Sequence, residues 1–207
     1  MNEASVNLEE AGIGEGISEV IVTTQSAAGE RNAAPIGIIT TMNEQEQEEI
    51  KYFVKLYKGS QTLANVLETN TLAANVTADV VLFVKVAFEN LSENYFADFE
   101  GMPVLKEANA WIVFTTVLAE ESSEYFRFRL MPKAVGIKRK EVKAINRGRN
   151  AVIEAAVLAT RFEITKDERG REEMRNQMER YDDIVKKCGG LRENEAMRVL
   201  QEKCPFR

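Results

Sequence analysis

The stretch Glu19-Val-Ile-Val-Thr-Thr24, followed after a polar turn by Asn32-Ala-Ala-Pro-Ile-Gly-Ile-Ile-Thr40, decides the fold prediction. Both segments are short, apolar and rich in β-branched residues, which predicts two strands joined by a loop through Gly29. The second strand begins with small residues and a proline, and its members are Asn32, Ala33, Ala34, Pro35, Ile36 and Gly37. Small side chains leave a flat wall with accessible backbone groups, which is suited to a planar ring.

A polar cluster follows the third expected strand at Lys58-Gly-Ser-Gln-Thr62, and Asn65 comes three residues later. Gly59 lets the turn expose its backbone amides, and the hydroxyls of Ser60 and Thr62 add donors at a spacing of two. A helix beginning near Leu63 would direct its N-terminus at the same place. A phosphate cradle next to a ring wall predicts a flavin mononucleotide (FMN) site. Taken alone, each motif also fits an ordinary strand entry or an ordinary turn with a helix cap.

The composition excludes several classes of protein. The 207 residues carry a formal net charge of −6, which argues against a general nucleic-acid-binding role. There is no histidine, which excludes Ser-His-Asp and Cys-His catalysis and every histidine-ligated metal site. The two cysteines, Cys188 and Cys204, cannot form a four-cysteine zinc site, so we expect no metal and two reduced thiols. A chain that performs redox chemistry without histidine would borrow a cofactor.

Targeting and membrane signals are not visible in the sequence. No run of apolar residues is long enough to cross a bilayer. The segment Met1–Glu10 is polar and acidic, unlike a secretory signal. We therefore expect a cytoplasmic protein that binds neither membranes nor nucleic acids.

The expected secondary structure up to Pro132 consists mostly of strands. Short stretches rich in β-branched and aromatic residues alternate with polar turns. They cover Val20–Thr24, Ala34–Thr41, Lys51–Tyr57, Leu72–Val76, Ala110–Ala119 and Tyr125–Met131. A helical turn is expected over Leu63–Glu68, and a buried helix over Val80–Phe88, because Asp79 is a good N-cap. Six strands with one or two short helices predict a small barrel.

After Pro132, alanine, glutamate, arginine and methionine dominate, which predicts helices. We expect three of them, over Asn146–Phe162, Asp167–Cys188 and Glu193–Lys203. The fold class is therefore α+β, with a β-barrel and a small C-terminal α-helical domain. The expected boundaries are a flexible leader over residues 1–16, the barrel domain over 17–135 and the helical domain over 136–207.

The motifs together resemble a known group of proteins. Thr23-Thr24, Gly29, Asn32-Ala-Ala-Pro35, a strand, Ser60-x-Thr62-x-x-Asn65 and Asn75 resemble the FMN-binding split-barrel, flavin reductase-like group. More narrowly, residues 17–200 resemble a largely archaeal family of flavoproteins of unknown function, which join such a barrel to a helical C-terminal domain. The stretch Arg147–Arg161 resembles the signature of that second domain.

This resemblance implies a homodimer with FMN bound in a groove near the subunit interface. It implies that Asn32, Ala33, Ala34, Pro35, Ile36 and Gly37 line the isoalloxazine ring. It also implies that Lys58, Ser60, Gln61 and Thr62 hold the ribityl phosphate, and that Asn65 orients their turn. No catalytic residue is identified, because the motifs contain no obvious acid or base.

Four functions remain open at this point. The leading hypothesis is an FMN-dependent oxidoreductase that acts on an unknown small molecule. The second is a flavin-binding module without turnover, and the third is a protein of the same fold that binds a deazaflavin. The fourth is a partner-binding protein that works through the helical domain and a basic stretch over residues 133–149. Well-studied flavin reductases often have a histidine on their nicotinamide side, so reduction by a nicotinamide cofactor is not supported here.

Overall fold

The computed structural model describes residues 8–43, 49–140 and 146–205. The chain divides into two compact units, which are described separately below. The barrel unit contains the described residues up to Ala78 and from Asn90 to Lys140. The helical unit contains Asp79–Glu89 and the described residues from Asn146 onwards. The single boundary predicted near residue 135 leaves Val80–Phe88 in the barrel domain.

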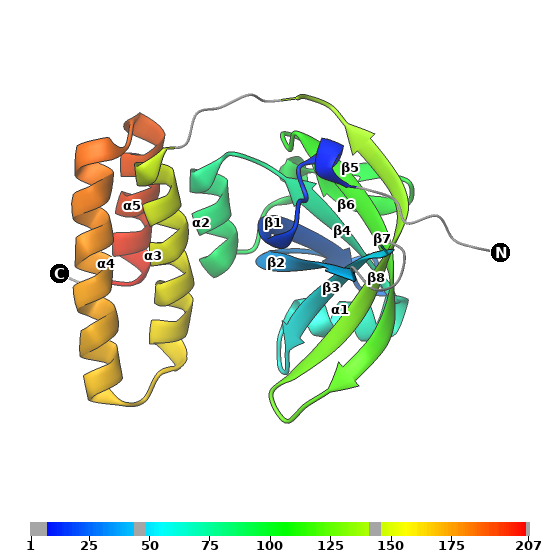
Figure 1. Ribbon diagram of the computed structural model, residues 1–207, viewed down its shortest axis with the longest axis horizontal. Coiled ribbons are helices and arrows are strands. Elements are labelled where there is room, and N and C mark those ends of the chain that lie inside the picture. Colours follow the sequence, from blue (N-terminus) through cyan, green and yellow to red (C-terminus); the bar gives the residue numbers. More distant parts are fainter. Residues whose placement is uncertain (1–7, 44–48, 141–145, 206–207) are drawn as a thin grey trace. The chain divides into compact units, whose positions relative to one another are not determined.

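The barrel unit is built on six strands that close on themselves in the order β1-β2-β3-β8-β7-β4 (Figure 1). All neighbouring pairs are antiparallel. The strands are β1 (Gly16–Gln25), β2 (Arg31–Asn43), β3 (Glu49–Tyr57), β4 (Thr71–Val76), β7 (Ala110–Glu121) and β8 (Tyr125–Ile137). The predicted barrel is thereby confirmed, and each of its six predicted strands is found, several of them longer than expected.

Alternation along each strand builds the barrel core. In β3, Tyr52, Val54 and Leu56 are buried, while Lys55 and Tyr57 between or beside them are exposed. A strand of period two directs these two sets to opposite faces. Helix α1 (Gln61–Thr69) adds Leu63 and Val66 to the same core cluster.

A hairpin that the sequence analysis missed packs on the barrel. It consists of β5 (Phe96–Phe99) and β6 (Met102–Leu105), preceded by the 3-10 turn η2 (Glu93–Tyr95). Asn75 fixes it, because its Oδ1 accepts a hydrogen bond from the backbone N–H of Leu105 at 2.6 Å. The Asn75 Nδ2 donates to the Ile21 carbonyl at 2.9 Å. Asn75 is fully buried, so this residue of the family motif has a structural role in the barrel.

The segment before β1 belongs to the barrel core. The 3-10 turn η1 (Glu9–Ala11) lies between Leu8 and Ile13, and each of these two is only 1% exposed. The backbone N–H of Leu8 donates to the Tyr52 hydroxyl at 3.1 Å. The sequence predicts a flexible leader over residues 1–16. Residues 1–7 lie outside the described part of the chain, and residues 8–13 are packed instead.

The helical unit contains α2 (Val80–Phe88), α3 (Arg147–Ile164), α4 (Glu168–Cys188) and α5 (Leu191–Lys203), as Figure 1 shows. The four predicted helical segments are confirmed, and their ends differ from the expected ones by at most two residues. Asp79, Asn146 and Asp167 act as N-caps of the first three. Gly148 and Gly189 bring α3 close to the α4–α5 turn, because a Cβ on Gly148 would lie 2.5 Å from the Gly189 Cα. None of the helices in the described ranges is both long and apolar enough to span a membrane.

Candidate functional site

The two predicted halves of the site meet at one hydrogen bond. The Asn32 Nδ2, at the start of β2, donates to the Thr62 Oγ1, in the first turn of α1, at 3.0 Å. Thr62 is 3% exposed and Asn32 is half-buried, so the bond is largely shielded from water. The structure therefore brings the strand that was predicted to hold a ring next to the helix start that was predicted to hold a phosphate.

A second polar chain fixes α1 against β1. The Gln61 Nε2 donates to the Asn65 Oδ1 at 2.7 Å, and the Asn65 Nδ2 donates to the Thr24 Oγ1 at 3.0 Å. Thr24 is fully buried and pairs with Asn32 across β1 and β2. The five side chains Thr24, Asn32, Gln61, Thr62 and Asn65, which we call the polar junction, thus connect β1, β2 and α1. Buried polar groups that are satisfied in this way hold elements in one arrangement.

Ser60 is the N-cap of α1, and its hydroxyl is occupied within the protein. The Ser60 Oγ accepts from the Leu63 N–H at 3.3 Å and donates to the Tyr57 carbonyl at 2.8 Å. The Ser60 carbonyl accepts from the Ala64 N–H. The first N–H groups of a helix have no acceptor within the helix. The backbone N–H groups of Gln61 and Thr62 therefore remain for a ligand or for solvent, and they lie at the positive end of the helix dipole.

The turn before α1 positions Lys58 and Gly59. Gly59 has φ of +86°, a left-handed conformation that any other residue would adopt only with strain. Open space surrounds the position of its missing Cβ. The Lys58 Nζ pairs with the Glu121 Oε1 at 3.1 Å and lies 5.0 Å from the Phe126 ring centroid. Lys58 thus lies next to the start of α1, and its ammonium group forms an ion pair with Glu121 of β7.

The β2 segment that was predicted to line a ring divides between two faces. Ala34 and Ile36 lie opposite Val22 and Val20 in the register, on the side of the barrel core. Ala33, Pro35 and Gly37 alternate with them on the opposite face, where Ala33 is only 6% exposed and Pro35 and Gly37 are half-buried. A planar ligand on one side of β2 would therefore contact every second side chain at most, together with the backbone between them.

Gly37 is the position on this face where a side chain would not fit. A Cβ at Gly37 would lie 2.7 Å from the Ile17 Cγ2 and 3.3 Å from the Glu19 Oε1. The Glu19 side chain is therefore placed over Gly37, to which it is directly opposite on β1. A group bound on the outer face of β2 near Gly37 would contact this carboxylate.

Thr24 is the one member of the junction that was not predicted as a site residue. Its position in the Thr23-Thr24 pair of the family motif was the available signal. The pairing of Thr24 with Asn32 was visible only once the β1–β2 register was known. Among the described residues no cluster of three or more carboxylates or thiols is placed to hold a metal ion.

The basic stretch over residues 133–149 is only partly described, because residues 141–145 lie outside the described part. Of its described members, Lys138 donates to the Lys106 carbonyl at 2.7 Å, and Lys140 pairs with Glu10 at 3.2 Å. Both cations are thus engaged by groups of the barrel unit itself. Such contacts are typical of a solvated surface with ion pairs.

Comparison with known proteins places this geometry in a family. Residues 18–139 match the model of the N-terminal domain of a protein of unknown function, DUF447, and residues 146–202 match a second DUF447 model. The chain belongs to the DUF447 family. A crystal structure of an FMN-bound DUF447 protein from Methanosarcina mazei is 38% identical and has a TM-score of 0.84. That similarity covers 95% of this chain and 100% of the other.

Two further relatives of this DUF447 chain are more distant. An uncharacterized protein of Methanocaldococcus jannaschii is 26% identical over 199 residues, which cover 89% of this chain and 96% of that protein. A flavin reductase domain protein from an Arthrobacter species is 9% identical, with a TM-score of 0.50, over 61% of this chain and 80% of that one. The last similarity shows a common barrel fold. The sequence-based assignment to a flavin reductase-like barrel family with a helical C-terminal domain is confirmed.

Proposed function

We propose that this DUF447 protein binds FMN, with the phosphate at the N-terminus of α1 and the isoalloxazine ring along β2. The observation that carries the proposal is the Asn32–Thr62 hydrogen bond, which joins the two segments. The FMN-bound relative at 38% identity supports the same cofactor.

Within this proposal the residues have distinct roles. The backbone N–H groups of Gln61 and Thr62 bind the phosphate, and Lys58 adds a positive charge. Ser60 caps the helix and so keeps those N–H groups directed at the ligand. Asn65 orients the turn through Gln61 and Thr24. When bound, FMN would supply the electron transfer, and the protein would bind it, orient it and set its hydrogen bonds.

The absorption spectrum of freshly purified protein tests the cofactor. Bound FMN predicts a yellow protein with flavin absorption bands, and extracted cofactor with the mass of FMN. A deazaflavin in the extract would agree with the proposed binding site but would identify a cofactor other than FMN. A colourless protein that also takes up no added FMN would contradict the proposal.

We propose further that the bound flavin serves as the redox centre of an oxidoreductase with a small-molecule substrate. The polar junction contains amides and hydroxyls and no carboxylate or amine, which suits a flavin that does the chemistry itself. Stopped-flow comparison of reduced bound FMN with reduced free FMN, across a panel of electron acceptors, tests this. Faster transfer from the bound form to at least one acceptor supports an enzyme, whereas equal rates for all favour a flavin-binding module.

The proposal includes a homodimer with FMN near the subunit interface. A single strand such as β2 covers only one face of a planar ring, so a second copy would shield the other face. Sedimentation of the protein with and without FMN tests this part. We expect a dimer with FMN, and a monomer at micromolar concentration in both states would contradict it.

A further inference from the structure

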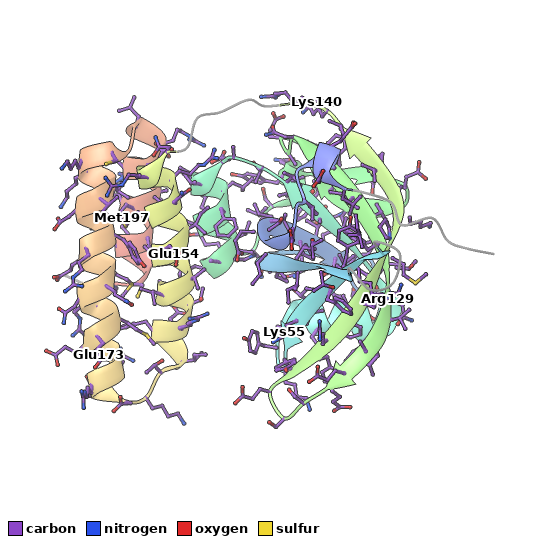
Figure 2. All side chains as sticks on the ribbon, in the orientation of Figure 1. Lys55, Arg129, Lys140, Glu154, Glu173 and Met197 are labelled. Atoms are coloured by element: carbon purple, nitrogen blue, oxygen red, sulfur yellow. The ribbon has the colours of Figure 1, made fainter. Side chains whose placement is uncertain are left out.

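The outer face of β3 and β8 carries two like charges in direct opposition. Lys55 on β3 is the register partner of Arg127 on β8. Directly opposite side chains on antiparallel strands lie about 4.5–5.5 Å apart at Cβ, and like charges there destabilise the pair. Lys55 is exposed and Arg127 is half-buried. Figure 2 labels Lys55, and also Arg129, which follows on β8 two residues after Arg127.

Neither cation of this pair is neutralised within the described ranges. No described carboxylate lies at ion-pair distance from Lys55 or from Arg127. The Arg127 Nε is buried and has no hydrogen-bond partner among the described residues. Glu120, the register partner of Arg127 on β7, accepts a hydrogen bond from the Tyr125 hydroxyl at 3.3 Å instead.

Aromatic rings hold both cations in place. The Arg127 Cζ lies 4.1 Å from the Phe53 ring centroid, and the Lys55 Nζ lies 4.8 Å from the Tyr125 ring centroid. Tyr125 packs edge-on against Tyr57, with ring centroids 6.3 Å apart, and Tyr57 is 62% exposed. Cation–aromatic stacking fixes the two charges on the face, where Lys55 is exposed and Arg127 is half-buried.

Exposed apolar and aromatic side chains lie beside the charged pair. Phe53 on β3 and Val117 on β7 flank Arg129 of β8 in the register, so this face carries a third cation. Val117 is 51% exposed and Tyr57 is 62% exposed. Exposed apolar side chains next to charges mark a protein interaction surface.

We propose that this face, formed by Phe53, Lys55, Tyr57, Tyr125, Arg127 and Val117, binds a partner protein through an acidic segment that also carries apolar or aromatic side chains. Carboxylates of the segment neutralise Lys55 and Arg127, and its apolar side chains cover Tyr57 and Val117. The formal net charge of −6 and the presence of Glu120 beside the face disfavour a nucleic acid in the same place.

The test uses the full chain as purified and a fluorescently labelled poly(Glu,Tyr) copolymer as the acidic probe. Fluorescence anisotropy at low ionic strength measures binding to wild type, to Lys55→Gln/Arg127→Gln and to a matched control. The control is Arg180→Gln/Lys187→Gln, which removes the same two kinds of charge from exposed positions on α4. We expect the first variant to bind at least about tenfold more weakly than wild type, and the control to bind within about twofold.

Three outcomes would overturn the proposal. Equal loss in both variants would show that the probe senses only net charge. Binding of poly(U) RNA, and not of the copolymer, that depends on Lys55 and Arg127 would assign the face to nucleic acid. No copolymer binding, together with a wild-type dimer that the Lys55→Gln/Arg127→Gln variant dissociates in sedimentation, would assign the face to a second copy of this chain.

The melting temperature of the same variant separates a binding role from a structural one. Because the two cations repel each other, their removal should leave the melting temperature within about 2 °C of wild type. A fall of about 5 °C or more would show that the pair holds β3 and β8 together, and the argument from an uncompensated pair would fail.

Discussion

Thr62 is the residue on which both halves of the site depend. Its hydroxyl accepts the hydrogen bond from Asn32, and its backbone N–H lies in the first turn of α1. The side chain is 3% exposed, so in the proposed site it acts by positioning, and the backbone N–H is the group proposed to bind the phosphate. The β2 segment proposed to line the ring and the start of α1 are thus connected through one side chain.

Replacement of Thr62 by valine should therefore affect stability and binding together. Thr62→Val keeps the shape but leaves the Asn32 amide without its acceptor, at a cost of about 1–2 kcal/mol in the free energy of unfolding. FMN affinity should fall with it, because the start of α1 loses its link to β2. Urea unfolding of the FMN-free protein and calorimetric titration with FMN measure the two effects. Thr62→Ser, which keeps the hydroxyl, is the control, and wild-type behaviour of the valine variant would contradict the assigned role.

Single residues of the site were predicted with uneven success, for physical reasons. The sequence shows that Ser60 and Thr62 are hydroxyl donors at a spacing of two. It does not show that the Ser60 hydroxyl is engaged as a helix cap, or that Thr62 points toward Asn32. Both facts depend on where α1 begins and on how it packs against the barrel end. The contacts of the predicted site residues with FMN stay a prediction.

Helices α2 and α5 form the clearest pair of elements, because an ion pair joins them at each end. At one end the Arg192 guanidinium donates to both carboxylate oxygens of Asp79 at 2.7 Å. At the other end the Lys203 Nζ lies 2.6 Å from the Glu89 Oε1. Asp79 has a second role, since its Oδ1 accepts from the N–H groups of Val81 and Leu82. The first ends of the two helices are thus paired with each other, and so are their last ends, which means that the helices run parallel.

The two roles of Asp79 can be separated by two substitutions. Asp79→Asn keeps a capping oxygen and loses the charge, so it should cost only about 0.2–1 kcal/mol in the free energy of unfolding. Asp79→Ala also removes the cap and should cost about 1 kcal/mol more. Chemical denaturation of both variants measures the difference. Equal costs would show that the cap contributes nothing.

The ion pair at the other end predicts a dependence on pH. The hydrogen bond from Lys203, together with its charge, lowers the pKa of Glu89 below its usual 4.5. The same bond raises the pKa of Lys203 above its usual 10.5. A lowered carboxyl pKa stabilises the fold above the unfolded value and ceases to do so as the pH falls through the folded value. A raised lysine pKa stabilises the fold below its unfolded value and ceases to do so as the pH rises through the folded value.

Wild type should therefore exceed Glu89→Gln in stability by a constant amount between about pH 6 and pH 9. The difference should shrink below about pH 4.5, where the carboxyl takes up its proton in the unfolded chain, and it should be lost as the pH falls through the lower pKa of the folded protein. Urea unfolding at a series of pH values measures it. The pair is exposed, so the difference should also decrease in high salt. A difference that persists unchanged at pH 3 would contradict an electrostatic origin.

At the level of elements, hydrophobic periodicity predicted the long helices and the barrel strands, and it missed the two short strands of the hairpin. Helices α3, α4 and α5 have extended one-sided patterns, and the six barrel strands alternate or are continuously apolar. Strands β5 and β6 are four residues each, and β6 contains Pro103, so neither gave a strand pattern. The core residues Leu8, Ala11 and Ile13 lie among acidic residues and glycines. Because of these polar and flexible neighbours, the segment was predicted to be a flexible leader.

The whole molecule is two units whose boundary does not follow the chain. Helix α2 comes from the middle of the barrel sequence but belongs to the helical unit. Six of its nine residues are buried, among them Leu82, Phe83 and Val84. The sequence identified α2 as a buried helix, but a segment that is apolar on all sides does not reveal which neighbours bury it.

Truncation of the chain after the barrel should therefore fail. Deletion of residues 142–207 removes α3 and α5, the partners of α2 within its unit, and exposes its apolar surface. We expect the truncated protein to aggregate, measured by elution in the void volume of a sizing column. A second truncation that also replaces residues 79–89 with a short Gly/Ser linker should remain dispersed. A monodisperse first truncation would contradict the assignment of α2 to the helical unit.

The central claim is that one ligand spans the two segments joined by Asn32 and Thr62, with its phosphate at the start of α1. Calorimetric titration of the flavin-free protein with FMN and with riboflavin, which lacks the phosphate, tests it most directly. The account predicts binding of FMN at least about a hundredfold tighter than riboflavin, with most of that difference lost in Thr62→Val. Equal affinities for FMN and riboflavin, or no heat with either, would contradict it.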